Sequence, residues 1–280
     1  MVFFENFRLS ARLPWLVAAV VACLAVTEAQ ADNDVVRLAA SMSTANSGLM
    51  AILMPKFAED TKFRLELTAV ATGKALRLGR DGMVDVVLVH APAAEEQFIA
   101  SGHGIKRLAV MQNDFIVVGP KTDPARIKAS RDVVDTFRRI GESKTGFVSR
   151  ADDSGNHRME LAFWRDAGIH PYGHWYHEVG KGMADALEIA NREKSYLFID
   201  RGTWLKRRSS VDLVPLFEGD ERLLNVYTAI AVNPAKHPHV NHDGAQAFID
   251  WITSRKTAEL IASYRIDGEQ LYVPRAAAAN

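Results

Sequence analysis

Cysteine is almost absent from this chain. Cys23 is the only one among 280 residues, so the fold cannot rely on an internal disulfide and must be held together by a buried core. An excess of charge is absent as well, because 34 lysines and arginines balance 34 aspartates and glutamates. This neutrality argues against nucleic acid or an anionic membrane as the main partner. It leaves room for a local anion site, which needs only a few well-placed donors.

A hydrophobic run long enough to span a membrane is also missing. The apolar run Leu13–Val26 has about 14 residues, whereas a transmembrane helix needs about 20. Two arginines precede this run, and the small-x-small pattern Ala29-Gln30-Ala31 follows it. The arrangement predicts an exported protein with a signal peptide at residues 1–31, cleaved after Ala31.

Two alternatives to this cleavage stay open. The apolar run could be retained as a membrane anchor, or the chain could be lipidated at Cys23, since residues 20–23 loosely fit a lipoprotein cleavage box. Apolar residues continue past Cys23, which favours cleavage after Ala31. The chain from Asp32 onward is long enough for one large or two medium domains.

Strand-like and helix-like segments alternate along the rest of the chain. Short runs rich in β-branched and aromatic residues predict strands at 35–39, 64–70, 85–90, 114–118, 147–150, 174–179, 196–200 and 225–232. Apolar residues at helical spacing predict helices at 49–57, 156–166, 182–193, 202–207 and 243–264. Repeated strand–helix units are typical of an α/β protein with mainly parallel sheets.

Three strand-to-helix turns carry the polar residues with the clearest chemistry. The candidate ligand-binding residues are Ser41, Ser43 and Thr44 in the first turn, Thr72 and Gly73 in the second, and Arg150, Ser154 and Asn156 in the third. Hydroxyls, amides and backbone N–H groups donate hydrogen bonds without titrating at neutral pH, and an arginine adds a permanent charge. Such donors at the carboxyl ends of strands favour a small oxyanion as ligand.

Each turn taken alone also suits a simpler role. Serine, threonine, aspartate and asparagine are the preferred caps of helix N-termini, so one such turn indicates capping more than binding. Arg150 could instead form a structural salt bridge with Asp152 or Asp153. The occurrence of three similar turns, one with an arginine, is what favours binding.

Competing chemical motifs are incomplete. Residues 71–75 resemble a phosphate-binding loop without its upstream glycine or the hydroxyl residue after lysine. Ser154 and His157 could serve an exported α/β hydrolase, but no Gly-x-Ser-x-Gly elbow is present. His174 and His177, with the adjacent acids 152–153, could hold a metal, yet on a strand the two histidines would point to opposite faces. No metal, cofactor or catalytic residue is therefore expected.

Beyond these turns the chain resembles the solute-binding components of bacterial ABC-type tungstate transporters. The resemblance covers essentially the whole exported chain and rests on many ordered matches. They are Asn46-Ser47-Gly48-Leu49, residues 71–76, residues 85–92, Asn113-Asp114-Phe115, residues 117–120, Ser149-Arg150 with Asp153-Ser154-Gly155, Gly180-Lys181-Gly182-Met183, Asp200-Arg201-Gly202-Thr203 and Asn233-Pro234.

The resemblance implies a class II periplasmic binding protein with two α/β lobes that close on the ligand about a hinge. It places lobe one at 32–117 plus 218–280 and lobe two at 118–217. The first two turns would then lie on lobe one, and the turn of Arg150 on lobe two. The implied function is a monomeric periplasmic receptor that captures tungstate, or molybdate, and delivers it to a membrane permease and ATPase. An oxyanion sensor that passes its ligand to another protein stays open as an alternative.

The chain departs from the family pattern at four positions near the turns. Ala40 and Met42 stand where the family has threonines, Ala151 replaces a glycine, and Asn156 replaces a threonine. Arg150, the family's anion contact, is retained and is expected to be the only full positive charge in contact with the anion. Fewer hydroxyls predict weaker discrimination among tetrahedral oxyanions.

Overall fold

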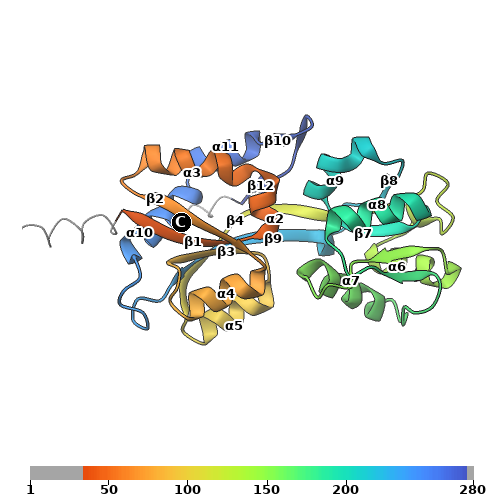
Figure 1. The fold of residues 1–280 in the computed structure, drawn as a ribbon, viewed down its shortest axis with the longest axis horizontal. Coiled ribbons are helices and arrows are strands. Elements are labelled where there is room, and N and C mark those ends of the chain that lie inside the picture. The colour runs from red at the N-terminus through yellow and green to blue at the C-terminus, as the bar shows by residue number, and fades with distance from the viewer. Residues whose placement is uncertain (1–33, 276–280) are drawn as a thin grey trace, which may run out of the picture.

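The computed structural model describes residues 34–275, which form two lobes joined by long antiparallel strands. The two strands are β4 (Gly104–Gly119) and β9 (Leu224–Val232), and they run side by side between the lobes in Figure 1. They lie in the middle of one continuous sheet of order β2-β1-β3-β9-β4-β7-β5-β6. This confirms the predicted two-lobed α/β class.

The β1 lobe is built on three parallel strands: β1 (Val35–Ser41), β2 (Arg64–Val70) and β3 (Val86–Val89). The strand β3 is buried along its whole length, as expected for a parallel strand covered on both faces. The helices of this lobe are α2 (Met42–Ser47), α3 (Leu49–Asp60), α4 (Thr72–Arg80), α5 (Pro92–Ala100), α10 (His242–Ile252) and α11 (Arg255–Ser263).

The β5 lobe repeats this plan with the parallel strands β5 (Phe147–Ser149), β6 (Tyr176–Glu178) and β7 (Tyr196–Asp200). Strand β8 (Val214–Phe217) pairs antiparallel with the end of β4. The helices of this lobe are α6 (Val133–Ser143), α7 (Gly155–Asp166), α8 (Met183–Glu193) and α9 (Arg201–Arg207), with short 3-10 turns η1 (Ile127–Ala129), η2 (Arg208–Ser210) and η3 (Glu221–Leu223).

The C-terminal segment passes back over the junction of the lobes. A short hairpin of β10 (Arg265–Ile266) and β11 (Glu269–Gln270) is followed by β12 (Val273–Pro274), which pairs with β4 at Met111 and Gln112. The junction is therefore built from β4, β9 and this C-terminal strand.

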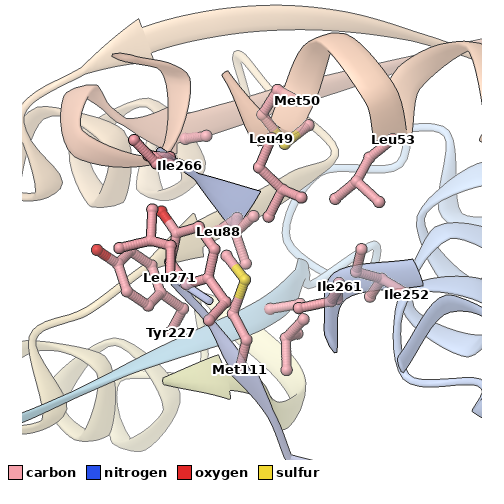
Figure 2. Packing of buried hydrophobic residues seen from close by; sticks show 14 of the residues in the cluster. Leu49, Met50, Leu53, Leu88, Met111, Tyr227, Ile252, Ile261, Ile266 and Leu271 are labelled. Atoms are coloured by element: carbon pink, nitrogen blue, oxygen red, sulfur yellow. The ribbon is translucent and has the colours of Figure 1, made fainter. Parts of the chain in front are cut away.

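Apolar side chains from distant parts of the sequence pack between these elements. In Figure 2, Leu49 and Leu53 of α3, Met111 of β4 and Ile252 of α10 belong to one cluster of buried residues. The β5 lobe has a separate, aromatic cluster, in which Trp164 packs edge-on against Phe137 and Phe147. Burial of this apolar surface is the main stabilising term for a fold without disulfides.

Several predicted elements have different bounds in the structure. The segment 114–118 is the end of the 16-residue strand β4, and the segment predicted as a strand at 174–179 is extended only over Tyr176–Glu178. The predicted helix 243–264 is two helices, because Ser254 caps the start of α11 by accepting from the N–H of Thr257 at 3.2 Å. The first polar turn is itself helical, as α2 begins directly after Ser41.

The predictions for the N-terminal segment lie outside the described residues. They are the signal peptide at 1–31, the cleavage after Ala31 and lipidation at Cys23. Within residues 34–275, no helix is both long and apolar enough to cross a membrane.

Candidate functional site

A cavity of about 630 Å³ lies where the two lobes meet. Its wall includes Ser43 of α2 from the β1 lobe, Arg150 after β5 and Thr203 of α9 from the β5 lobe, and Asn113 and Tyr227 of the joining strands. The carboxyl ends of β1 and β5 thus face the same space, which is the usual place for ligands in open α/β sheets.

Three hydroxyls of the first turn form a connected cluster. The Ser41 side chain lies 3.0 Å from the hydroxyl of Ser43 and 2.7 Å from that of Thr44, and it accepts from the Thr44 N–H at 3.3 Å. Ser41 and Thr44 are buried, and neither is part of the cavity wall. Ser43 is the member that reaches the cavity, and the other two fix its position.

The floor of the cavity is a hydrogen-bonded network of neutral groups. Asn225 donates through Nδ2 to Oδ1 of Asn113 and to the hydroxyl of Tyr227, both at 3.0 Å. The Ser43 hydroxyl lies 3.3 Å from Nε2 of His90 and 3.4 Å from the Tyr227 hydroxyl. The network therefore links α2 of the β1 lobe to both joining strands.

Burial keeps this network uncharged at neutral pH. Removal from water lowers the pKa of His90 to about 4, although a hydrogen bond with Asn225 opposes the shift. The same cause raises the pKa of Tyr227 to about 12. The floor thus offers hydroxyl and amide donors that neither gain nor lose a proton near pH 7.

Arg150 supplies charge from the opposite lobe. Its guanidinium donates through Nη2 to Oδ2 of Asp152, so the salt bridge considered from the sequence is present. Asp152 also accepts from the Ser154 N–H at 3.2 Å. Burial raises the pKa of Asp152, but the hydrogen bonds from Ser154 and the charge of Arg150 outweigh it and hold the pKa below its usual value. The Nε atom of Arg150 is buried without a hydrogen-bond partner among the described residues.

The backbone of this turn is strained. Ala151 and Asp153 adopt φ values of 49° and 56°, in the left-handed region that disfavours residues with a Cβ atom. Ala151 is the position at which the family pattern has glycine. The turn of Arg150 thus keeps a conformation that its present residue types do not favour.

The remaining predicted site residues lie at helix starts and do not line the cavity. Thr72 and Gly73 open α4, and the register of Ser41 with Val70 places their turn beside the first one. Ser154 is the N-cap of α7 and accepts from the His157 N–H at 3.3 Å. Asn156 is buried and donates to the Phe198 carbonyl at 3.4 Å, while its Oδ1 has no partner among residues 34–275.

The substituted positions differ in their relation to the cavity. Met42 lines it and is 48% exposed, whereas Ala40 is buried in β1 and Asn156 lies behind the wall. Only Met42 can therefore alter the surface that a ligand meets in this arrangement.

Sequence reasoning missed several residues of the wall. Lys206 and Arg207 of α9 line the cavity, so Arg150 is not its only cation, and Asp185 and Asp200 add carboxylates. Asp200 caps α9 by accepting from the N–H and the hydroxyl of Thr203, each at 2.8 Å. Asn225 and Tyr227 are spaced two apart in the mainly apolar strand β9, so they lie on one face of it. This spacing was a signal that could have indicated the floor.

The metal site and the hydrolase pair considered from the sequence are not assembled among residues 34–275. The described residues contain no group of three histidines, cysteines or acids that could hold a metal. His177 is bonded through Nε2 to the carbonyl of His174 and through Nδ1 to Glu193. The ring of His157 accepts from the Asp153 N–H at 3.1 Å, and the Ser154 hydroxyl is engaged with the backbone N–H of His157 instead of its ring.

Comparisons with known proteins agree with this architecture. The pattern of the PBP superfamily domain matches residues 27–256. The chain is 44% identical over 256 residues to the tungstate-binding protein TupA of Peptoclostridium acidaminophilum, covering 90% of this chain and 89% of the relative. The tungstate-binding protein TupA of Desulfovibrio alaskensis G20 superposes with a TM-score of 0.81 at 40% identity, covering 87% of this chain and 99% of that one.

A second solved structure, described as the tungstate ABC transporter from Geobacter sulfurreducens, gives a TM-score of 0.73 at 40% identity and covers 82% of this chain and 99% of that one. These matches span most of each partner and both lobes of the fold. The chain therefore belongs to the PBP superfamily and, within it, to the family of the tungstate-binding proteins.

Proposed function

We propose that this protein is a periplasmic receptor that binds a tetrahedral oxyanion, tungstate or molybdate, between its lobes and delivers it to the permease and ATPase of an ABC transporter. The observation that carries the proposal is the shared cavity of Arg150 and Ser43, which come from different lobes. The names of its relatives, which describe tungstate binding, support the same ligand class.

The two sides of the cavity supply complementary interactions. The network of Ser43, Asn113 and Tyr227 offers neutral donors, and Arg150 offers a charged fork that suits an oxyanion. An anion that touches both sides has its full set of contacts only when the lobes are together. Binding then favours the closed state, which is the state that a permease can recognise.

The proposal also includes the lobe boundaries, the export of the chain, its oligomeric state and the residues that contact the anion. We propose lobe boundaries at 117/118 and 217/218, a cleaved signal peptide at 1–31, a monomer without nucleic-acid partners, and a binding role without catalysis. The anion contacts are proposed to come from the turns of Ser41, Ser43 and Thr44, of Thr72 and Gly73, and of Arg150, Ser154 and Asn156. Of this set, Ser43 and Arg150 are the members that line the cavity.

A calorimetric panel tests the ligand class. Tungstate, molybdate, sulfate, phosphate and vanadate are titrated separately into the anion-free protein. Tight binding of tungstate or molybdate, with sulfate and phosphate much weaker, supports the proposal. Binding of none of the five would contradict it.

A further inference from the structure

Helices α2 and α9 meet across the cavity although they belong to different lobes (Figure 1). Lys206 of α9 donates from Nζ to the backbone carbonyl of Asn46 in α2. Both residues also line the cavity. This hydrogen bond is a direct link between the lobes on the side of the cavity away from the joining strands.

The carbonyl of Asn46 has a different kind of partner from its neighbours at the end of α2. The carbonyl of Thr44 accepts from the Ser47 hydroxyl at 2.7 Å, and that of Ala45 accepts from the Gly48 N–H at 3.3 Å. The Ser47 carbonyl accepts from Tyr264 at 2.6 Å, within the β1 lobe. Only the Asn46 carbonyl, among these four, depends on the β5 lobe for its partner, and a cation is favourable at this end of a helix.

The basic residues beside Lys206 make different contacts. Arg208 pairs with Asp267 and Glu269 of the C-terminal hairpin, with 2.9 Å between its Nε and Oδ2 of Asp267. Arg207 lines the cavity, and its side chain has no hydrogen bond or ion pair to residues 34–275 that the structure records. Lys206 is thus the member of this basic run that reaches α2.

We propose that Lys206 is a positioning residue for anion binding, which holds α2 and its Ser43 hydroxyl against the β5 lobe in the closed state. This inference rests on the proposed oxyanion function and adds a residue outside the three turns to it. The helix α2 has only six residues, so a contact at Asn46 is transmitted directly to Ser43 in the preceding turn. Opening of the lobes breaks the Lys206 contact, and its formation therefore favours closure.

The test measures the separation of the lobes and the release of the anion in the same protein. Spin labels are placed at Glu96→Cys in α5 and Glu142→Cys in α6, two exposed positions on different lobes, in a Cys23→Ser background. Inter-label distances are recorded with and without saturating tungstate, and tungstate dissociation is followed by stopped flow. The variants are Lys206→Met, Lys206→Arg and, as a matched loss of one exposed lysine, Lys128→Met.

We expect Lys206→Met to broaden the distance distribution of the tungstate-saturated protein toward longer values. We also expect it to speed tungstate dissociation about three- to tenfold, as for the loss of one solvent-exposed hydrogen bond of ordinary net strength. Lys206→Arg should keep the distance distribution and the dissociation rate close to those of the wild type. Lys128→Met should match the wild type in both quantities. Faster release with an unchanged distance distribution would overturn the proposal, because it would make Lys206 a direct ligand of the anion. No change in either quantity would also overturn it. A wild-type protein that does not respond to tungstate or molybdate would instead contradict the proposed function itself.

Discussion

The two turns that face each other across the cavity are built in opposite ways. The turn of Ser41–Ser47 is neutral, and its buried hydroxyls bond to one another, as in the 2.7 Å contact between Ser41 and Thr44. The turn of Arg150 is charged, strained at Ala151 and partly unsatisfied at Nε of Arg150. The turn of Ser41–Ser47 is thus a preformed side of the cavity, with its hydroxyls fixed in place. The turn of Arg150 is a poised side, whose charge is paired with Asp152 and would be available to the proposed anion.

Replacement of Arg150 should cause the largest loss of anion affinity, because the poised side supplies charge to the proposed site. Arg150→Met removes charge-assisted hydrogen bonds worth about 1.5–3 kcal/mol each, so tungstate affinity should fall about a hundredfold or more. Arg150→Lys keeps the charge without the planar fork and should lose at least tenfold. Titration calorimetry measures both, with the Tm of the anion-free protein as the check on folding. Unchanged affinity in Arg150→Lys would remove Arg150 from the site.

His90 tests whether the preformed side must stay neutral. Its pKa is lowered to about 4 in the folded protein, from an ordinary value near 6.5, so the unfolded chain binds the proton more readily. The native state therefore loses stability as the pH falls from about 6.5 to about 4, by up to about 3 kcal/mol. Replacement by Asn should remove that part of the pH dependence, which urea unfolding at several pH values would show. Burial raises the pKa of Glu160 to about 7, so this group affects the pH dependence of stability with the opposite sign. It does so in the wild type and in the His90 variant alike, and its contribution cancels when the two curves are subtracted. Parallel curves for the two proteins would contradict the neutral floor.

Tyr227 probes the floor that joins the two sides. Tyr227→Phe removes the hydroxyl that accepts from Asn225 and lies near Ser43, which should cost about 1 kcal/mol in both stability and anion binding. Tyr196→Phe is the matched control, because its buried hydroxyl bonds Asp123 and Ala125 away from the cavity. The control should lose stability and retain affinity. Equal affinity for the two variants would exclude the floor from ligand binding.

Replacement of Ala151 by glycine should change the stability least among these variants, and it tests the backbone strain on the poised side. At a φ of 49° glycine avoids the clash of the Cβ atom, but it adds freedom to the unfolded chain. Ala151→Gly should therefore raise the stability of the anion-free protein by only about 0.5–1 kcal/mol, measured by urea unfolding. A loss of stability would show that the turn is not strained at this residue.

The sequence was sufficient to predict the α/β plan and the position of Arg150 in the cavity wall, because strand–helix alternation places the residue after β5 at the edge where ligands bind. Its role in binding stays a prediction. It was insufficient for the floor, because Asn113 and Asn225 are brought together by the pairing of β4 with β9 across more than a hundred residues. It also could not separate binding from capping at Ser154, since the same hydroxyl chemistry serves both. In the sequence, Lys206 and Arg207 are typical of the basic, exposed end of a helix. Their place at the cavity depends on how the lobes meet.

Solution scattering with and without tungstate tests the central claim, that the anion is held between the two lobes. The account predicts a smaller radius of gyration on saturation with tungstate, together with a Tm that rises with anion concentration as expected for a ligand bound to the native state. Arg150→Met, at the same tungstate concentration, should show neither change. A rise in Tm without compaction would place the site within one lobe and contradict the account.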